Sequence, residues 1–234
     1  MYLALRSLKS YLRAFTDLIY VRTCPGCGAA MLRAEKFICL GCQVDLPLNP
    51  FFHSSENEIK AVFSGRLPLR TANTLLYFTK NGIAQHLLHA LKYQDREDIG
   101  EFLGEMLGAE LVKTDCKPDI ILPVPLHKSK QKQRGYNQCH SIALGLQREL
   151  GGAITFDAVE RSVANPSQTK LNRAKRWDNV DGIFSLQKPQ LLANKHVLLI
   201  DDTLTTGATL ESCGQTILQA ENVAISIATL AYAK

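Results

Sequence analysis

The chain has 234 residues, of which 46% are hydrophobic and 21% are charged. This length and balance predict a soluble globular protein with one good-sized core plus an appendage, or two small domains, and they exclude a disordered chain. The formal net charge of +5 is too mild for a protein that coats nucleic acid, and charged residues interrupt every stretch long enough to span a bilayer.

The first 21 residues predict an amphipathic helix rather than a signal peptide. Hydrophobic residues recur there at spacings of three and four: Leu5, Leu8, Leu12, Phe15 and Ile19. Charges break each apolar run, and no small-residue cleavage site follows. We therefore expect the helix to pack on the protein rather than on lipid, and we expect a cytoplasmic protein without a membrane span.

Four of the seven cysteines form two C-x-x-C pairs, each with a glycine before its second cysteine. The four are Cys24, Cys27, Cys39 and Cys42. Two such turns can each present two thiolates to one tetrahedral ion, which predicts a structural zinc ribbon. A redox pair would need only one C-x-x-C and a βαβ setting, and an iron–sulfur cluster fits the ligand number but not the layout. With four protein ligands the zinc would have no open position for catalysis.

Residues 46–70 are rich in Pro, Ser and Asn and predict a linker or edge region. We therefore expect two domains, an N-terminal helix and ribbon in residues 1–60 and a main domain in residues 70–234. The main domain begins with a predicted strand in 71–82 that ends in Asn-Gly, and two helical patterns follow up to residue 113.

Short apolar runs then alternate with helical patterns. Strands are predicted at 119–124, 153–159, 196–201 and 222–232, with helices at 137–150 and 209–220 and a hairpin partner for the second strand at 182–186. Runs that are apolar on both sides suit strands buried on both faces. The alternation predicts an α/β fold, a parallel sheet with helices on both faces.

Two adjacent carboxylates, Asp201 and Asp202, lie at the carboxyl end of the strand predicted at 196–201, where the functional loops of a parallel sheet leave. The next residues supply hydroxyls and a glycine and then enter a helix, whose N-terminus favours a phosphate. The acids suit hydroxyls or a cation. A ribose 5-phosphate carries hydroxyl groups and a phosphate about one sugar apart, so it would suit both the acids and the helix N-terminus.

An aliphatic strand, two acids and Thr-Thr-Gly-x-Thr together resemble the phosphoribosyl pyrophosphate (PRPP) loop of type I phosphoribosyltransferases. With the segments "PVPLHKSKQKQRGYNQ" (123–138) and "ALKYQDREDIGEFLG" (90–104) and the cysteine ribbon, the chain resembles the ComF family, which is linked to DNA uptake in competent bacteria.

The resemblance implies specific roles. Asp201 and Asp202 would be the catalytic pair that contacts ribose, directly or through Mg²⁺. The PRPP-binding residues would be Thr203, Thr205, Thr206, Gly207, Ala208 and Thr209, and the diphosphate-binding residues Lys130, Arg134 and Asn137. Residues 161–176 correspond to the mobile loop that closes over the substrate.

Three functions are compatible with these patterns. The first is a Mg²⁺-dependent, PRPP-binding phosphoribosyltransferase-like protein of DNA uptake, an enzyme if an acceptor exists. The second is a non-catalytic module that binds single-stranded DNA or an uptake helicase and keeps a vestigial or sensory PRPP site. Basic runs at 128–134 and 170–176 favour it, although both runs also suit solvated loops. A PRPP-sensing regulator ranks last, because no helix-turn-helix is recognisable. Oligomeric state and acceptor are left open by the sequence.

Overall fold

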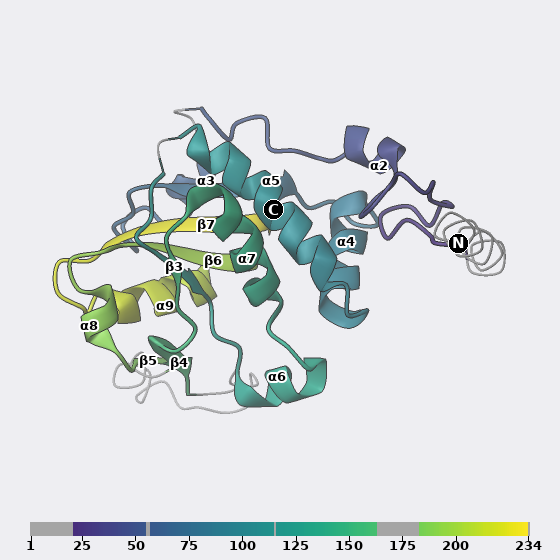
Figure 1. Ribbon diagram of the computed structural model, residues 1–234. Coiled ribbons are helices and arrows are strands. Elements are labelled where there is room, and N and C mark those ends of the chain that lie inside the picture. The colour runs from purple at the N-terminus through teal and green to yellow at the C-terminus, as the bar shows by residue number, and fades with distance from the viewer. Residues whose placement is uncertain (1–20, 55–56, 115, 163–182, 234) are drawn as a thin grey trace, which may run out of the picture.

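The computed structural model describes residues 21–54, 57–114, 116–162 and 183–233 (Figure 1). A five-stranded parallel sheet with the order β1-β7-β6-β2-β3 forms its centre. Its strands are β1 Ala72–Tyr77, β2 Ile120–Pro123, β3 Ala153–Ile154, β6 His196–Leu204 and β7 Ala224–Tyr232. The predicted parallel α/β fold is therefore confirmed.

Helices cover both faces of this sheet. On one face lie α4 Ile83–Tyr93, α5 Glu97–Val112 and α7 Gln138–Leu150, and on the other α3 Glu58–Ala61, α8 Pro189–Leu192 and α9 Ala208–Ile217. The two outer layers pack on alternate residues of β6: Leu198 and Ile200 on the first face, Val197 and Leu199 on the second. This alternation decides where the polar residues at the end of β6 point.

Close packing of α5 against α7 depends on glycine. A Cβ on Gly145 would lie 2.1 Å from the carbonyl oxygen of Glu101, and one on Gly104 would lie 2.4 Å from that of Ile142. The backbones of these two helices therefore meet directly. The contact fixes α7, which carries functional residues at its N-terminus.

Two segments in the second half of the chain differ from the predictions. The basic run at 128–134 forms a helix, α6 Lys128–Arg134, because His127 caps its first turn by accepting from the backbone N–H of Ser129. The strand predicted at 153–159 is divided between β3 and β4 Val159–Arg161, and β5 Phe184–Leu186 pairs antiparallel with β4 alone. A turn at 155–158 separates the two pieces, so only the first reaches the central sheet.

The segment predicted as a linker, 46–70, contributes to the core. Phe52 joins the cluster beneath α4 and α5, while Ile59, Phe63 and Leu67 pack on the opposite layer. The ribbon residues Ile38 and Cys42 belong to the same cluster as Phe52, so the ribbon and the main domain share one core. The boundary near residues 60–70 stays a prediction.

The helix predicted in the first 21 residues lies outside the described residues except for Val21, as do most of the predicted mobile loop 161–176 and the whole basic run 170–176. Within the described ranges, no helix combines the length and apolar character needed to cross a bilayer.

Candidate functional site

The two predicted acids lie at the carboxyl end of β6, but their side chains point to different faces of the sheet. Strand β6 runs through Leu204, past the predicted end at Asp201, and successive side chains of a strand point to opposite faces. Asp202 is 5% exposed and is turned toward α4 and α7. Asp201 lines the pocket formed with the following loop. The strand thus divides the pair into one buried carboxylate and one that faces the pocket.

Asp202 is held by two residues that sequence reasoning missed. The ammonium of Lys92, from the last turn of α4, lies 2.9 Å from its Oδ1, and the side-chain amide of Gln138 donates to Oδ2. The same ammonium lies 3.4 Å from the hydroxyl of Thr203. Both partners belong to segments that carried the family resemblance, 90–104 and 123–138. That was the available signal, but it did not indicate that these side chains meet the acids.

Asp201 lies in a setting that disfavours its charge. Burial, and then repulsion by Asp202, raise its pKa to about 7. Its Oδ1 accepts from the backbone N–H of Asp202 at 2.8 Å and lies 3.6 Å from Sγ of Cys139. Burial, with both acids adding to it, raises the pKa of the Cys139 thiol well above its usual value. A cation beside Asp201 would relieve the repulsion and favour the ionised carboxylate.

The threonine loop has the expected form. Thr205, Thr206, Ala208 and Thr209 are exposed, and α9 begins at Ala208, where its first N–H groups lack partners within the helix. With Asp201 and Thr203 these residues line one polar pocket. Helix-terminal N–H groups, hydroxyls and the positive end of the helix dipole suit a bound phosphate.

Gly207 is required for a reason other than access to a ligand. Its φ of +78° lies in the left-handed region, and a Cβ there would approach Cε1 of Phe63 to 2.8 Å. Arg66 donates to the carbonyl oxygen of Thr206 at 3.0 Å and forms an ion pair with Glu211 of α9. The segment before β1 therefore braces the loop from behind.

The three predicted diphosphate residues have different positions. Lys130 is exposed on α6. Arg134 donates to Gln138 at 2.9 Å, and its guanidinium carbon lies 5.3 Å from the ring centre of Tyr93. Asn137 is 4% exposed, caps α7 by accepting from Cys139 and donates to the carbonyl of Val124 at 3.1 Å. Arg134 is thus linked to Asp202 through Gln138, whereas the amide of Asn137 is engaged within the fold.

The four cysteines of the ribbon converge on one point. Their sulfur atoms all lie within 4.8 Å of one another, and those of Cys27 and Cys39 are 3.6 Å apart. Zinc–sulfur bonds of 2.3 Å in a tetrahedron place the sulfurs about 3.8 Å apart, so the cluster fits one such ion. Structural zinc is the ion these four thiols would hold, and all four positions of the ion would be filled.

Backbone N–H groups face these sulfurs as well. Gly26 and Cys39 donate to Sγ of Cys24 at 3.4 and 3.3 Å. Burial raises the pKa of Cys24, but these N–H groups and that of Cys27 outweigh it and lower the pKa to about 7. A side chain on Gly26 would place its Cβ 2.8 Å from Sγ of Cys42, and the Gly26 carbonyl accepts from His86 of α4 at 2.8 Å. The first cysteine turn is therefore packed against the main domain.

The parallel sheet, the acid at its carboxyl edge and the hydroxyl-rich loop that opens α9 define the chain as an α/β protein with a polar pocket at the carboxyl edge of its sheet. No family model matches it. It is 30% identical over 146 residues to the DNA utilization protein YhgH of Escherichia coli K12, covering 60% of this chain and 63% of that protein. It is 28% identical over 204 residues to competence protein F of Haemophilus influenzae, covering 80% and 86%. With competence protein ComFC of Bacillus subtilis it shares 27% identity over 143 residues, covering 61% and 56%. These relatives, named for competence and DNA utilization, support the resemblance to the ComF family that the motifs indicated.

Solved structures with a partial likeness are more distant. One is an allosteric regulatory enzyme of purine biosynthesis, with 18% identity, a TM-score of 0.43 and coverage of 60% of this chain and 29% of that one. Another is a hypoxanthine phosphoribosyltransferase from Staphylococcus aureus, with 21% identity, a TM-score of 0.37 and coverage of 58% and 64%.

Proposed function

We propose that this chain is a PRPP-binding, Mg²⁺-dependent phosphoribosyltransferase-like protein that acts in DNA uptake or use. The observation that carries the proposal is the pocket between Asp201 and the threonine loop at the start of α9. It joins an acid that suits a ribose or a metal ion to a loop that suits a phosphate. The names of the relatives, DNA utilization protein and competence protein F, support the DNA-related role.

The chain's own residues would divide the work of binding. The loop Thr205–Thr209 would hold the 5-phosphate through backbone N–H groups and hydroxyls, and Asp201 would accept from ribose hydroxyls. Lys92 and Gln138 fix the orientation of Asp202. Arg134, connected to the site through Gln138, would meet the diphosphate. Mg²⁺, held through Asp201 and the substrate oxygens, would supply charge neutralisation for a leaving diphosphate.

Calorimetric titration of PRPP with and without Mg²⁺ tests this function. We expect binding that needs Mg²⁺ and that weakens at least 10-fold in Asp201→Asn, because the pocket-facing carboxylate is lost while the Lys92–Asp202 pair remains. Asp45→Asn, an exposed acid of the ribbon, is the matched control and should bind as the parent does. Absence of PRPP binding by the folded parent would contradict the proposal.

If PRPP binds, turnover is the next question. Release of diphosphate is then measured with nucleobases and with single-stranded DNA as acceptors. An acceptor that accelerates release would make the chain an enzyme, whereas release equal to that without an acceptor would leave a PRPP-binding protein.

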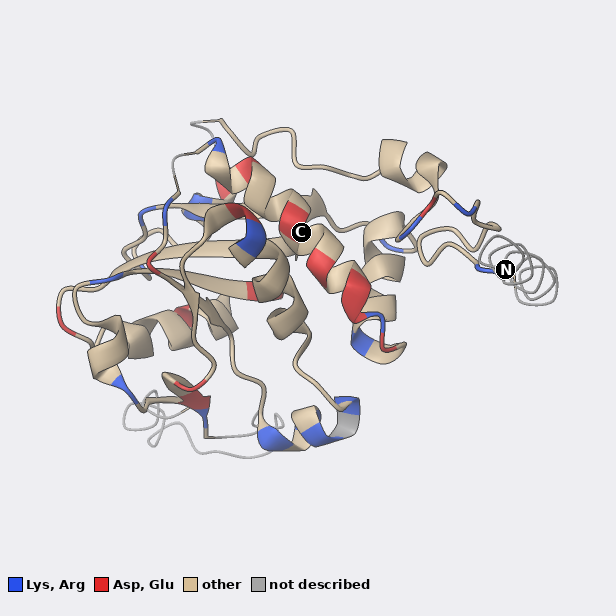
Figure 2. Ribbon diagram, viewed as in Figure 1, with Lys and Arg blue, Asp and Glu red and all other residues tan. Residues whose placement is uncertain are grey.

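One observation favours the second candidate, a module that binds single-stranded DNA. Helix α6 presents exposed Lys130 and Lys132, and Figure 2 shows its basic residues gathered apart from the acidic row on α5. Tyr93, 61% exposed, lies beside α6 under the guanidinium of Arg134. Exposed aromatic rings beside cations are typical of single-strand binding.

Fluorescence anisotropy with a labelled oligonucleotide tests this candidate. Binding should weaken with salt and fall in Lys130→Ala, Lys132→Ala, because fewer phosphates are neutralised. The double variant Lys36→Ala, Lys80→Ala removes two exposed charges elsewhere and should change binding much less. Equal losses in the two double variants would rule out a specific role for α6.

A further inference from the structure

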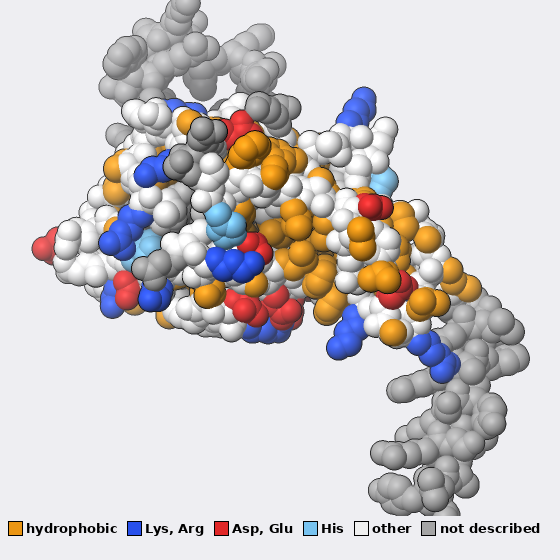
Figure 3. Space-filling model, turned by 90° about the horizontal axis from the view of Figure 1, so that it is seen from above, with side chains coloured by type: hydrophobic (Ala, Val, Ile, Leu, Met, Phe, Trp, Pro, Cys, Tyr) orange, Lys and Arg blue, Asp and Glu red, His pale blue; other side chains and the backbone are white. Residues whose placement is uncertain are grey.

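The ribbon exposes an apolar ridge. Of the large hydrophobic side chains in the described ranges, the three most exposed all belong to the ribbon: Val44 at 77%, Leu32 at 71% and Leu40 at 65%. Leu40 and Val44 are the two ends of α2 Leu40–Val44, and we call the three residues the ribbon ridge. Figure 3 shows hydrophobic side chains gathered on the part of the upper face that includes the ribbon.

The three side chains of the ridge adjoin one another. Leu40 and Val44 lie four residues apart on a helix, so they share a face, and Cys42 between them is buried. The carboxylate of Glu35 accepts from the backbone N–H of Leu40 at 2.7 Å and from that of Leu32 at 2.5 Å, which holds these two residues side by side. Neighbouring apolar side chains that stay this exposed mark a contact surface.

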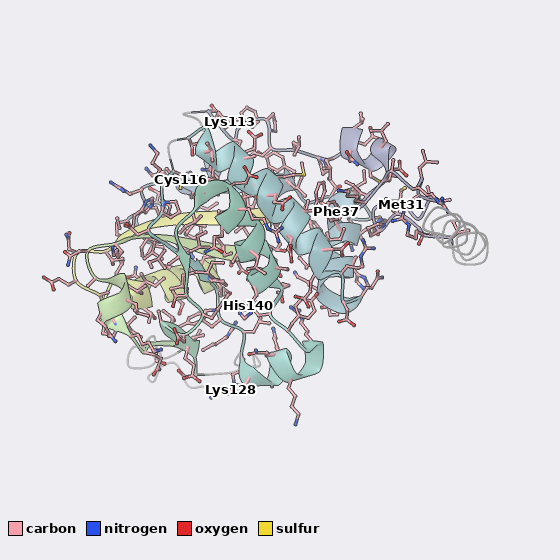
Figure 4. All side chains as sticks on the ribbon, in the orientation of Figure 1. Met31, Phe37, Lys113, Cys116, Lys128 and His140 are labelled. Carbon is pink, nitrogen blue, oxygen red and sulfur yellow. The ribbon has the colours of Figure 1, made fainter. Side chains whose placement is uncertain are left out.

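Other residues of the ribbon make its contact with the main domain. Ile38 and Cys42 are buried in the shared core, and the ring of Phe37 stacks on Phe102 of α5 with 4.8 Å between ring centres. In Figure 4, Phe37 lies next to α5, and Met31 lies farther out on the ribbon. Because the ridge residues are at least 65% exposed, they take little part in this contact, and the ridge is open to another partner.

The chain enters the ribbon beside the ridge. The backbone N–H of Met31 donates to the carbonyl of Arg22 at 2.8 Å, and the guanidinium of Arg22 donates to the carbonyl of Leu32 at 3.1 Å. Val21, the first described residue, is 55% exposed. Residues 1–20 therefore join the described chain next to Leu32.

The sequence of residues 1–20 predicts a helix that is apolar on one side. At 3.6 residues per turn, its large apolar residues fall within an arc of about 80°; they are Leu5, Leu8, Leu12, Phe15 and Ile19. The charged residues Arg6, Arg13 and Asp17 fall on the opposite side, so a contact through the apolar side would leave them in solvent.

The ridge and the last turns of this predicted helix have similar lengths. From Leu12 to Ile19 the helix would rise about 10 Å. The turn from Leu40 to Val44 rises about 6 Å, and Leu32 extends the ridge beyond α2. The two apolar surfaces are thus matched in length and are joined by a short connection.

We propose that the ribbon ridge is the docking surface for residues 1–20 of the same chain, which contact it through Leu12, Phe15 and Ile19. Tethering favours this occupant over a second copy of the chain, because a short connection gives an effective concentration on the order of millimolar. Burial of apolar side chains on both surfaces drives the contact. The proposal goes beyond the function proposed above and does not depend on it, since no ridge residue lines the threonine-loop pocket.

A photoreactive residue at position 15 of the whole chain tests this contact. Benzoylphenylalanine in place of Phe15 keeps an aromatic side chain there and links to groups that touch it on irradiation. We expect digestion and mass spectrometry to find position 15 joined to a peptide that holds a ridge residue, in a product with the mass of one chain. Adding Leu40→Gln, Val44→Gln should lower the yield about 5-fold or more, because two apolar contacts are lost.

The matched control is Val112→Gln, Leu144→Gln, which also replaces one valine and one leucine that are exposed on helices. Figure 4 labels Lys113, the neighbour of Val112, well away from Met31 of the ribbon. The control should leave the yield unchanged. All four substituted residues are exposed, so both variants should fold, and their circular dichroism spectra show whether they do.

The remaining outcomes each overturn the proposal. A product with the mass of two chains would make a second copy the occupant of the ridge. A link to the main domain alone would place residues 1–20 elsewhere, and no link is the result expected if they bind lipid or another protein. An equal yield in the ridge variant and the parent would show that Leu40 and Val44 do not form the contact.

Discussion

The cysteine ribbon and the end of β6 both place polar residues close together in the sequence, with opposite results. In the ribbon, residues three apart in a turn bring their side chains to one point, and two turns bring all four sulfurs together. On β6, two neighbouring acids lie on a strand and point to different faces, one into a pocket and one toward Lys92. Spacing predicts convergence only when the backbone between the residues is known to turn.

Loss of the ribbon's metal should have the largest effect. Cys24→Ser, Cys42→Ser removes two of four ligands, and the free energy of binding a structural zinc, roughly 10 kcal/mol or more, contributes to folding. We expect one zinc per parent chain by elemental analysis, much less in the variant, and a lower melting temperature.

Cys116→Ala is the control for the ribbon variant, because this buried cysteine lies outside the cluster. It should keep the full metal content. Equal zinc in all three proteins would show that the four sulfurs do not hold the ion.

The second largest loss of stability is expected when Asp202, the buried partner of Lys92 on β6, loses its charge. Asp202→Asn leaves the ammonium of Lys92, which is only 21% exposed, without its counter-charge. Breaking a buried pair from one side costs about 3–5 kcal/mol, and urea denaturation should show a loss of that order. In Asp157→Asn the lost pair with Lys188 is exposed, so the cost should stay below about 1 kcal/mol. Similar losses in both variants would contradict the structural role of Asp202.

Within the ribbon, the two glycines offer a smaller test. Gly26→Ala should destabilise the protein by about 2–3 kcal/mol and weaken zinc against a competing chelator, because the new Cβ meets Sγ of Cys42. At Gly41 the nearest atom, Sγ of Cys39, is 3.9 Å away, so Gly41→Ala should be neutral or slightly stabilising within α2 Leu40–Val44. If the two substitutions were equivalent, the first turn would not be tightly packed.

The smallest expected effect concerns the pocket-facing acid. The folded pKa of Asp201, about 7, lies above the ordinary 3.8, so between these values the folded state binds more protons than the unfolded state. Stability should therefore fall as pH rises from about 4 to 7. Asp201→Asn removes this loss, and its melting temperature relative to the parent should rise across that window.

Asp45→Asn removes an exposed carboxylate and is the control for this pH profile. Its difference from the parent should stay flat with pH. A flat difference for Asp201→Asn as well would mean that burial does not raise the pKa of this carboxyl.

The sequence predicted the sheet well because buried parallel strands are continuous apolar runs, as in 196–200 and 224–231. It predicted the cysteine cluster because C-x-x-C spacing is local. It did not predict that β6 continues to Leu204, since the buried Asp202 is held by Lys92 and Gln138, 110 and 64 positions earlier in the chain. The packing of Phe63 behind Gly207 is also a long-range contact, and nothing in the Pro- and Asn-rich segment before β1 indicated it.

Phe63 and Arg66 have a further consequence for the loop they support. Because the backbone of Thr206 and Gly207 is held from behind by a ring contact and a guanidinium hydrogen bond, little conformational entropy remains to be lost when an anion binds. Association at this loop should therefore be fast and accompanied by little ordering. Affinity would be set mainly by how quickly the anion leaves.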